Sequence, residues 1–89
     1  GTVWGDKLML AFVEIKEGAQ HAPHSHPHEQ AGMVTEGELR LQIGKDTQTL
    51  KAGAAYLIPG GVEHSAMALH GTARTLEIFS PPREEYKKS

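Results

Sequence analysis

The sequence predicts one small all-β domain that folds as a sandwich or a barrel. Ten glycines and five prolines divide the 89 residues into short segments, most of which alternate apolar with polar residues or are β-branched. Turn residues recur at intervals of roughly 8 to 12 positions, a spacing typical of antiparallel barrels. A chain of this length buries about 64% of its surface as a monomer, so it holds a single modest core.

The first predicted strand covers residues 8–16 and is apolar on both of its faces. The two faces carry Met9, Ala11, Val13 and Ile15 on one side and Leu8, Leu10 and Phe12 on the other. A barrel of this size cannot bury both faces by itself, so we expect a homodimer built on residues 8–15.

Six further strands are predicted downstream, separated by turns at residues 36–37, 44–46, 59–61 and 70–72. They cover residues 30–35, 39–43, 47–51, 54–58, 64–69 and 73–79. The proline pair at 81–82 ends the sheet, because proline cannot donate to a ladder. Residues 84–89 are predicted to be a charged, frayed tail.

Composition excludes several classes of function. The chain carries 9 basic and 11 acidic residues, a net charge of −2, so it has no basic surface for nucleic acid. Its longest apolar run, residues 8–13, is far shorter than the roughly 20 residues that span a bilayer. Because it has no cysteine and starts without a basic, apolar leader, we expect a cytoplasmic protein with neither nucleic acid nor membrane as partner.

Four of the six histidines lie within residues 21–28. Extended backbone places residues of equal parity on one face, so His24 and His26 can present two imidazoles to one point. Gln30 can join them from the following strand. This pattern favours a metal site, and the alternative is a solvent-exposed loop that is merely rich in histidine.

The spacing of residues 18–68 resembles the two motifs of the cupin family. The first motif, residues 18–37, has Gly18, His24, His26, Gln30 and Gly37, and the second, residues 53–68, has Gly53, Pro59, Gly61 and His64. The resemblance implies a single cupin domain over residues 1–89, a jelly-roll barrel (double-stranded β-helix) of roughly six to eight strands. It also implies a central metal ion, and its ligands would be His24, His26, Gln30 and His64.

Two positions depart from the family pattern. Gln30 replaces the usual carboxylate ligand, and Ala68 stands where an asparagine normally closes the second motif. Gln30 either binds the metal through its amide oxygen or hydrogen-bonds a metal-bound water. Three imidazoles and an amide leave the 2+ charge uncompensated, which favours an anionic or enolisable oxygen ligand. We expect one divalent transition metal (Ni, Zn, Mn, Fe or Co) acting as a Lewis acid.

The last strand offers a candidate for proton transfer. Period-two counting places Glu77 and Phe79 on one face and Leu76 and Ile78 on the other. If the two aliphatic residues face packed structure, Glu77 and Phe79 enter the barrel lumen. The residues alone favour a different arrangement, in which Glu77 faces solvent and pairs with Arg74 or Arg83.

Residues 24–30 and 77–86 resemble the KdgF-type cupins, which linearise 4,5-unsaturated monouronates in pectin and alginate degradation. That resemblance implies that Glu77 exchanges a proton, Phe79 packs on the sugar, and Arg83 binds the carboxylate of a small anionic substrate. The best-studied relatives carry Asp where this chain has Glu77. Two alternatives stay open: another small-acid cupin enzyme (a dioxygenase, isomerase or lyase), and a non-catalytic metal- or ligand-binding cupin.

Overall fold

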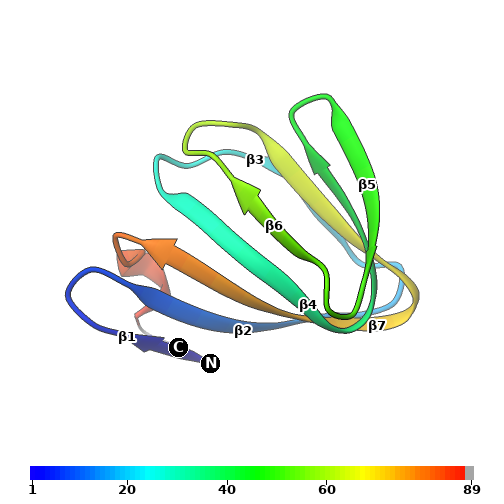
Figure 1. The fold of residues 1–89 in the computed structure, drawn as a ribbon, viewed down its shortest axis with the longest axis horizontal. Coiled ribbons are helices and arrows are strands. Elements are labelled where there is room, and N and C mark those ends of the chain that lie inside the picture. Colours follow the sequence, from blue (N-terminus) through cyan, green and yellow to red (C-terminus); the bar gives the residue numbers. More distant parts are fainter. Residues whose placement is uncertain (88–89) are drawn as a thin grey trace.

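Seven strands, paired antiparallel, form a barrel in the computed structural model (Figure 1). The structure describes residues 1–87; for residues 20–22 within this range it describes the backbone but not the side chains. The elements are β1 (Thr2–Trp4), β2 (Met9–Ile15), β3 (Gln20–His24), β4 (Glu29–Ile43), β5 (Asp46–Lys51), β6 (Ala55–Ile58), β7 (His64–Ser80) and the 3-10 helix η1 (Glu84–Tyr86). Within these described residues, no helix has the length and apolarity needed to cross a bilayer. The prediction of an all-β barrel is confirmed.

Two long strands, β4 and β7, carry the rest of the sheet. They pair from Glu29 opposite Ser80 to Ile43 opposite His64, and Figure 1 shows both as continuous bands. The strand order is β1-β2-β7-β4-β5, with β3 added to β7 and β6 added to β4. Strands this long must bend to close a barrel, and the register shifts between Val34 and Glu38 mark where β4 bends.

The predicted turns at residues 36–37 and 70–72 are wrong, because both segments are bends inside continuous strands. Gly37 has φ 83°, and a Cβ there would lie 2.5 Å from the carbonyl oxygen of Thr72. On β7, His70 (φ 57°) and Gly71 (φ 120°) adopt left-handed backbone. Glycine and other residues that favour turns also favour β-bulges. The sequence therefore indicated correctly that the backbone bends at these positions, but the bends lie inside strands and do not end them.

Of the remaining strands, some match the prediction and others were not predicted. The hairpin of β4 with β5 and the strand β6 follow the prediction, whereas β1 and β3 were not predicted, because neither alternates apolar with polar residues. Residues 84–86 form η1 and not a frayed tail, and residues 88–89 of the predicted tail lie outside the described residues.

The core lies against the inward face of the barrel. Its larger cluster contains Ile15, Val34, Leu39, Ala68 and Ala73, and a smaller one contains Met9, Ala11 and Phe79. The inward side of β2 is therefore buried as predicted. Its other side is open in the single chain, where Phe12 is 57% exposed, and Leu8, just before the strand, is 55% exposed.

Candidate functional site

Strand pairing brings three histidines to one end of the barrel. His24 ends β3 and lies directly opposite His64, the first residue of β7, so both side chains project from the same face. His26 follows in the loop before β4. The ring centroid of His64 lies 4.3 Å from that of His24 and 5.0 Å from that of His26. One ligand atom from each of the three lies within 4.8 Å of the others, a grouping that can hold a metal ion.

Backbone carbonyls fix which nitrogen of two rings faces the centre of the cluster. His26 Nδ1 donates to the carbonyl oxygen of His28 at 3.0 Å, and His64 Nδ1 donates to that of Val62 at 3.0 Å. A carbonyl only accepts, so in each neutral ring Nε2 keeps its lone pair. His64 Nε2 is buried and has no hydrogen-bond partner among the described residues. A metal ion satisfies such a buried lone pair.

The turn at residues 59–61 holds the histidine loop in place. Gly61 N–H donates to the carbonyl oxygen of His26 at 2.7 Å. A Cβ at Gly60 would collide with the carbonyl oxygen of Pro27, so only glycine lets the turn pack this closely on the loop. The glycines of the second motif thus position a ligand of the first.

Gln30 lies beside this cluster with its amide held in one orientation. The side chain is 9% exposed, and its Nε2 donates to Glu77 Oε1 at 2.7 Å. That bond turns Gln30 Oε1 toward His26 Nε2, 3.1 Å away. Two lone pairs facing each other repel unless a proton or a cation lies between them. The donor set therefore fits a divalent ion shared by His26 and Gln30.

Burial keeps two of the imidazoles in the form that binds metal. Burial, reinforced by the positive charge of Arg83, lowers the pKa of His26 below its ordinary value of 6.5. Burial likewise lowers the pKa of His64. A lowered pKa disfavours the imidazolium, so at neutral pH both Nε2 lone pairs are available.

The pKa directions of His26 and His64 predict how metal affinity depends on pH. Because the folded chain holds these two rings neutral below pH 6.5, neither of them is expected to weaken metal binding between about pH 8 and about pH 6.5. Below the lowered pKa values, protons compete with the metal and affinity declines. The stability of the metal-free fold declines earlier, as the pH falls from about 6.5 toward the lowered pKa values, because there the unfolded chain takes up protons that the folded chain does not. Calorimetric metal titrations at stepped pH measure this. Affinity that shows no proton dependence at any pH at which the chain stays folded contradicts a three-histidine site.

The structure places Glu77, Phe79 and Arg83 on the same cavity as His24 and His64. Glu77 is 7% and Phe79 is 2% exposed, so the solvent-facing alternative for Glu77 is wrong. Neither arginine pairs with it. Arg74 forms ion pairs with Glu14 and Glu36 on the outside of the barrel, and Arg83 pairs with Glu85.

Aromatic rings hold the guanidinium of Arg83 at the cavity. Its Cζ lies 5.3 Å from the ring centroid of Phe79 and 4.2 Å from that of Tyr86, and its Nη1 donates to the Tyr86 hydroxyl at 3.0 Å. The Thr2 hydroxyl donates to the carbonyl oxygen of Tyr86 at 3.1 Å, which ties η1 to β1. Arg83 is thus a fixed cation beside the histidine cluster.

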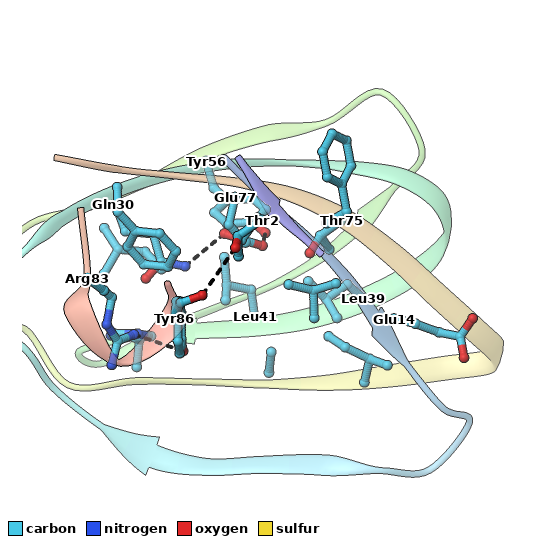
Figure 2. Close-up of a pocket in the computed structure, with 18 of the residues that line it drawn as sticks. Thr2, Glu14, Gln30, Leu39, Leu41, Tyr56, Thr75, Glu77, Arg83 and Tyr86 are labelled. Atoms are coloured by element: carbon cyan, nitrogen blue, oxygen red, sulfur yellow. Dashed lines mark hydrogen bonds between the residues drawn. The ribbon is translucent and has the colours of Figure 1, made fainter. Parts of the chain in front are cut away.

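The cavity has a volume of about 370 Å³ and two kinds of wall. Figure 2 shows Gln30 and Arg83 toward one end, Glu77 and Leu41 near the middle, and Leu39 toward the other end, where Thr75 and Glu14 are also labelled. Ile15 adds to the apolar lining. The cavity therefore suits a small ligand whose oxygen atoms gather at one end.

Sequence reasoning missed Tyr56, Tyr86 and Thr2. Tyr56 lies on β6 two residues before the buried Ile58, so its inward face was readable from parity alone. Its hydroxyl donates to Glu77 Oε2. Nothing in the sequence pattern indicates that Tyr86 and Thr2 meet, since they lie 84 residues apart.

Comparison with known families agrees with this geometry. Residues 11–79 match the family described as the cupin domain. The chain belongs to the cupin family. The cupin jelly-roll barrel inferred from the two motifs is thereby confirmed.

Two solved cupin structures resemble this one along almost its whole length. KdgF from a Halomonas species is 29% identical, with a TM-score of 0.91, over 96% of this chain and 79% of that one. An RmlC-like cupin from Shewanella frigidimarina is 28% identical, with a TM-score of 0.90, over 96% of this chain and 77% of that one. The chain is a small, KdgF-like cupin.

A curated relative carries a different activity in its name. H2HPP isomerase of Bacillus subtilis is 34% identical over 67 residues, which are 73% of this chain. The match spans only 28% of the length of that relative.

Proposed function

We propose that this cupin opens the ring of 4,5-unsaturated monouronates by metal-assisted proton transfer. One observation carries the proposal: the Glu77 carboxylate is buried in the cavity and hydrogen-bonded to Gln30, beside the three-histidine cluster. Arg83 supplies a fixed cation in the same cavity. The likeness to Halomonas KdgF supports the assignment.

In this proposal His24, His26, His64 and Gln30 Oε1 hold one divalent transition metal ion. When bound, the ion supplies a Lewis acid for substrate oxygen atoms. Imidazole-rich sites accept Ni, Zn, Mn, Fe and Co, and all five suit a reaction without electron transfer. Glu77 accepts a hydrogen bond from Gln30, so its negative charge lies close to the ion and partly offsets the ion's 2+ charge. The four neutral ligands leave that charge uncompensated.

The chain's own residues divide the remaining work. Glu77 takes the proton of the hemiacetal hydroxyl while the ring C–O bond breaks, and a proton returns to carbon 4 as the enol becomes a ketone. Arg83 holds the substrate carboxylate through its planar guanidinium. Phe79, which packs against Arg83, contacts the sugar ring. Protons and bonds balance without an oxidant or a reductant.

The test follows the ultraviolet absorbance of the unsaturated sugar. Freshly generated 4,5-unsaturated galacturonate is incubated with metal-loaded protein, with chelator-treated protein and with buffer. The proposal expects faster loss of the double-bond absorbance only with the metal-loaded protein. Equal rates in all three samples, with metal content verified, would exclude monouronate as the substrate.

A second candidate is favoured by the apolar wall of the cavity. Leu39 and Leu41 offer no hydrogen-bond partner to sugar hydroxyls, but they suit an acid with an apolar body. The same Glu77 and metal site would then isomerise that acid by removing and returning a proton. The sequence match to an H2HPP isomerase points the same way.

Substrate competition separates these two functions. A saturated uronate should inhibit the first activity and leave the second unaffected, whereas a small carboxylic acid with an apolar body should do the reverse. A dioxygenase is distinguished by oxygen uptake that stops when Zn²⁺ replaces a redox-active ion. A binding module would take up either ligand without consuming it.

We also propose that the outward sheet face joins a second copy of the chain. Two rows of directly paired residues cross this face and are apolar throughout. The rows are Val3, Leu10, Ile78, Ala31 and Leu57, and Phe12, Leu76, Met33 and Ala55. The next row, Glu14–Arg74–Glu36, is charged and forms a polar rim. A two-fold axis would bring the same apolar rows of two chains together.

If this face forms the dimer interface, a charged side chain placed within the apolar rows should prevent dimerisation. Light scattering at micromolar concentration is expected to give twice the mass of the chain, and Phe12→Lys is expected to give a monomer, because it buries an unpaired charge. Lys45→Glu, at an exposed position in the turn between β4 and β5 and away from the rows, is the control and should stay dimeric. A monomeric mass for the unmodified chain contradicts the proposal.

A further inference from the structure

Each oxygen atom of the Glu77 carboxylate, on which the proposed reaction depends, accepts a hydrogen bond from a neighbouring side chain. Glu77 Oε1 accepts a hydrogen bond from Gln30 Nε2 at 2.7 Å, and Glu77 Oε2 accepts one from the Tyr56 hydroxyl. Gln30 and Tyr56 come from different strands, β4 and β6, on the same side of β7. Figure 2 shows the three side chains gathered at one wall of the cavity. Together they fix the carboxylate in a single orientation.

Strand register explains how Tyr56 reaches Glu77. Both residues lie directly opposite Gly32 of β4, Tyr56 from β6 and Glu77 from β7. Directly opposed residues share a face of the sheet, so the two side chains meet above the glycine. A Cβ at Gly32 would lie 2.5 Å from Glu77 Oε1 and 2.5 Å from ring atoms of Tyr56. Only glycine leaves room for this contact.

Tyr56 acts as a hydrogen-bond donor at every working pH. Burial, followed by the charge of Glu77, raises the pKa of its phenol well above the usual range. The proton therefore stays on Tyr56 and points at the carboxylate. On its other side, across β2, Glu77 lies opposite Ala11, whose methyl side chain forms no hydrogen bond.

We propose that Tyr56 is the positioning residue of this site: its hydroxyl, reaching across Gly32, aims the Glu77 carboxylate at the ligand beside the histidine cluster. This rests on the proposed role of Glu77 in proton transfer. The Glu77 side chain has three rotatable bonds, and a hydrogen bond from Gln30 to one oxygen still lets the carboxylate turn, so it needs a second anchor to keep one orientation. Tyr56 provides that anchor.

The test compares Tyr56→Phe with Thr35→Val in the metal-loaded full chain. Tyr56→Phe removes the hydroxyl but keeps the ring, whereas Thr35→Val removes a hydroxyl that bonds β4 to Arg74 of β7 outside the cavity. Tyr56→Phe is expected to lower kcat between about 10-fold and 10²-fold, with KM and metal affinity unchanged. Thr35→Val should leave all three unchanged. A Tyr56→Phe kcat within twofold of the unmodified chain overturns the proposal.

Two further measurements keep this inference separate from the proposed reaction. Gly32→Ala is expected to force Tyr56 and Glu77 apart and to reproduce the loss of kcat. Crystal structures of Tyr56→Phe and of the unmodified chain show the carboxylate directly. If the unmodified chain turns over no tested substrate, the proposed function fails. Displacement of the Glu77 carboxylate in the variant then still supports positioning, and an unchanged single conformer refutes it.

Discussion

Replacing His64 with alanine is expected to lower divalent-metal affinity by more than about 10²-fold. Losing a hydrogen-bond partner of a metal ligand commonly costs about 10-fold to 10²-fold, and losing the ligand itself should cost more. His64 is the least exposed of the three clustered histidines at 5%, and its Nε2 has no other partner among the described residues. Calorimetric titration with Zn²⁺ or Ni²⁺ measures the loss.

The matched control removes an imidazole outside the cluster. His70 lies in the bend of β7 with φ 57°, a backbone conformation that asparagine tolerates, so His70→Asn should keep full affinity. Because alanine also empties a buried position, His64→Gln serves as a second variant that keeps more of the volume. Unchanged affinity in both His64 variants would mean that the metal binds elsewhere.

Replacing Glu77 with glutamine is expected to lower turnover of a confirmed substrate between about 10²-fold and 10⁴-fold, the usual contribution of a general acid or base. Glutamine has nearly the same shape and can still bond to Gln30 and Tyr56, but it cannot accept a proton in the reaction. The effect should therefore appear in kcat, with metal affinity retained. The ultraviolet assay of the unsaturated uronate measures it.

Glu17→Gln is the control for this substitution, because Glu17 is exposed and does not line the cavity. It should turn over substrate at the unmodified rate. Equal turnover by Glu77→Gln and the unmodified chain would remove Glu77 from the mechanism. A joint loss of metal and turnover would assign it a structural role at the metal site.

The histidine cluster could be predicted because its members are close in sequence or lie in a fixed motif. His24, His26 and Gln30 fall within seven residues, where extended backbone alone sets which side chains converge. His64 follows the turn at residues 59–61, which folds back onto the histidine loop through the Gly61–His26 hydrogen bond. The positions of these side chains depend on the geometry of short segments, and the spacing of residues in the sequence is enough to predict that geometry.

The partners of Glu77 could not be predicted in the same way. The contact with Tyr56 depends on the register of three strands around Gly32, and register is set by the whole sheet. Parity left Glu77 undecided between lumen and solvent, because it does not say which face of β7 meets the core. The bends at Gly37 and Gly71 escaped prediction for a related reason, since turns and bulges use the same residues.

Three histidines and Gln30 are expected to form a metal centre inside the barrel. Anomalous X-ray scattering from crystals of the purified protein, recorded at the absorption edge of the bound metal, locates the ion. We expect one peak at about 2.0–2.2 Å from a nitrogen of each of His24, His26 and His64 and from Gln30 Oε1. A peak elsewhere on the chain, or none after soaking with Ni²⁺ and Zn²⁺, would contradict it.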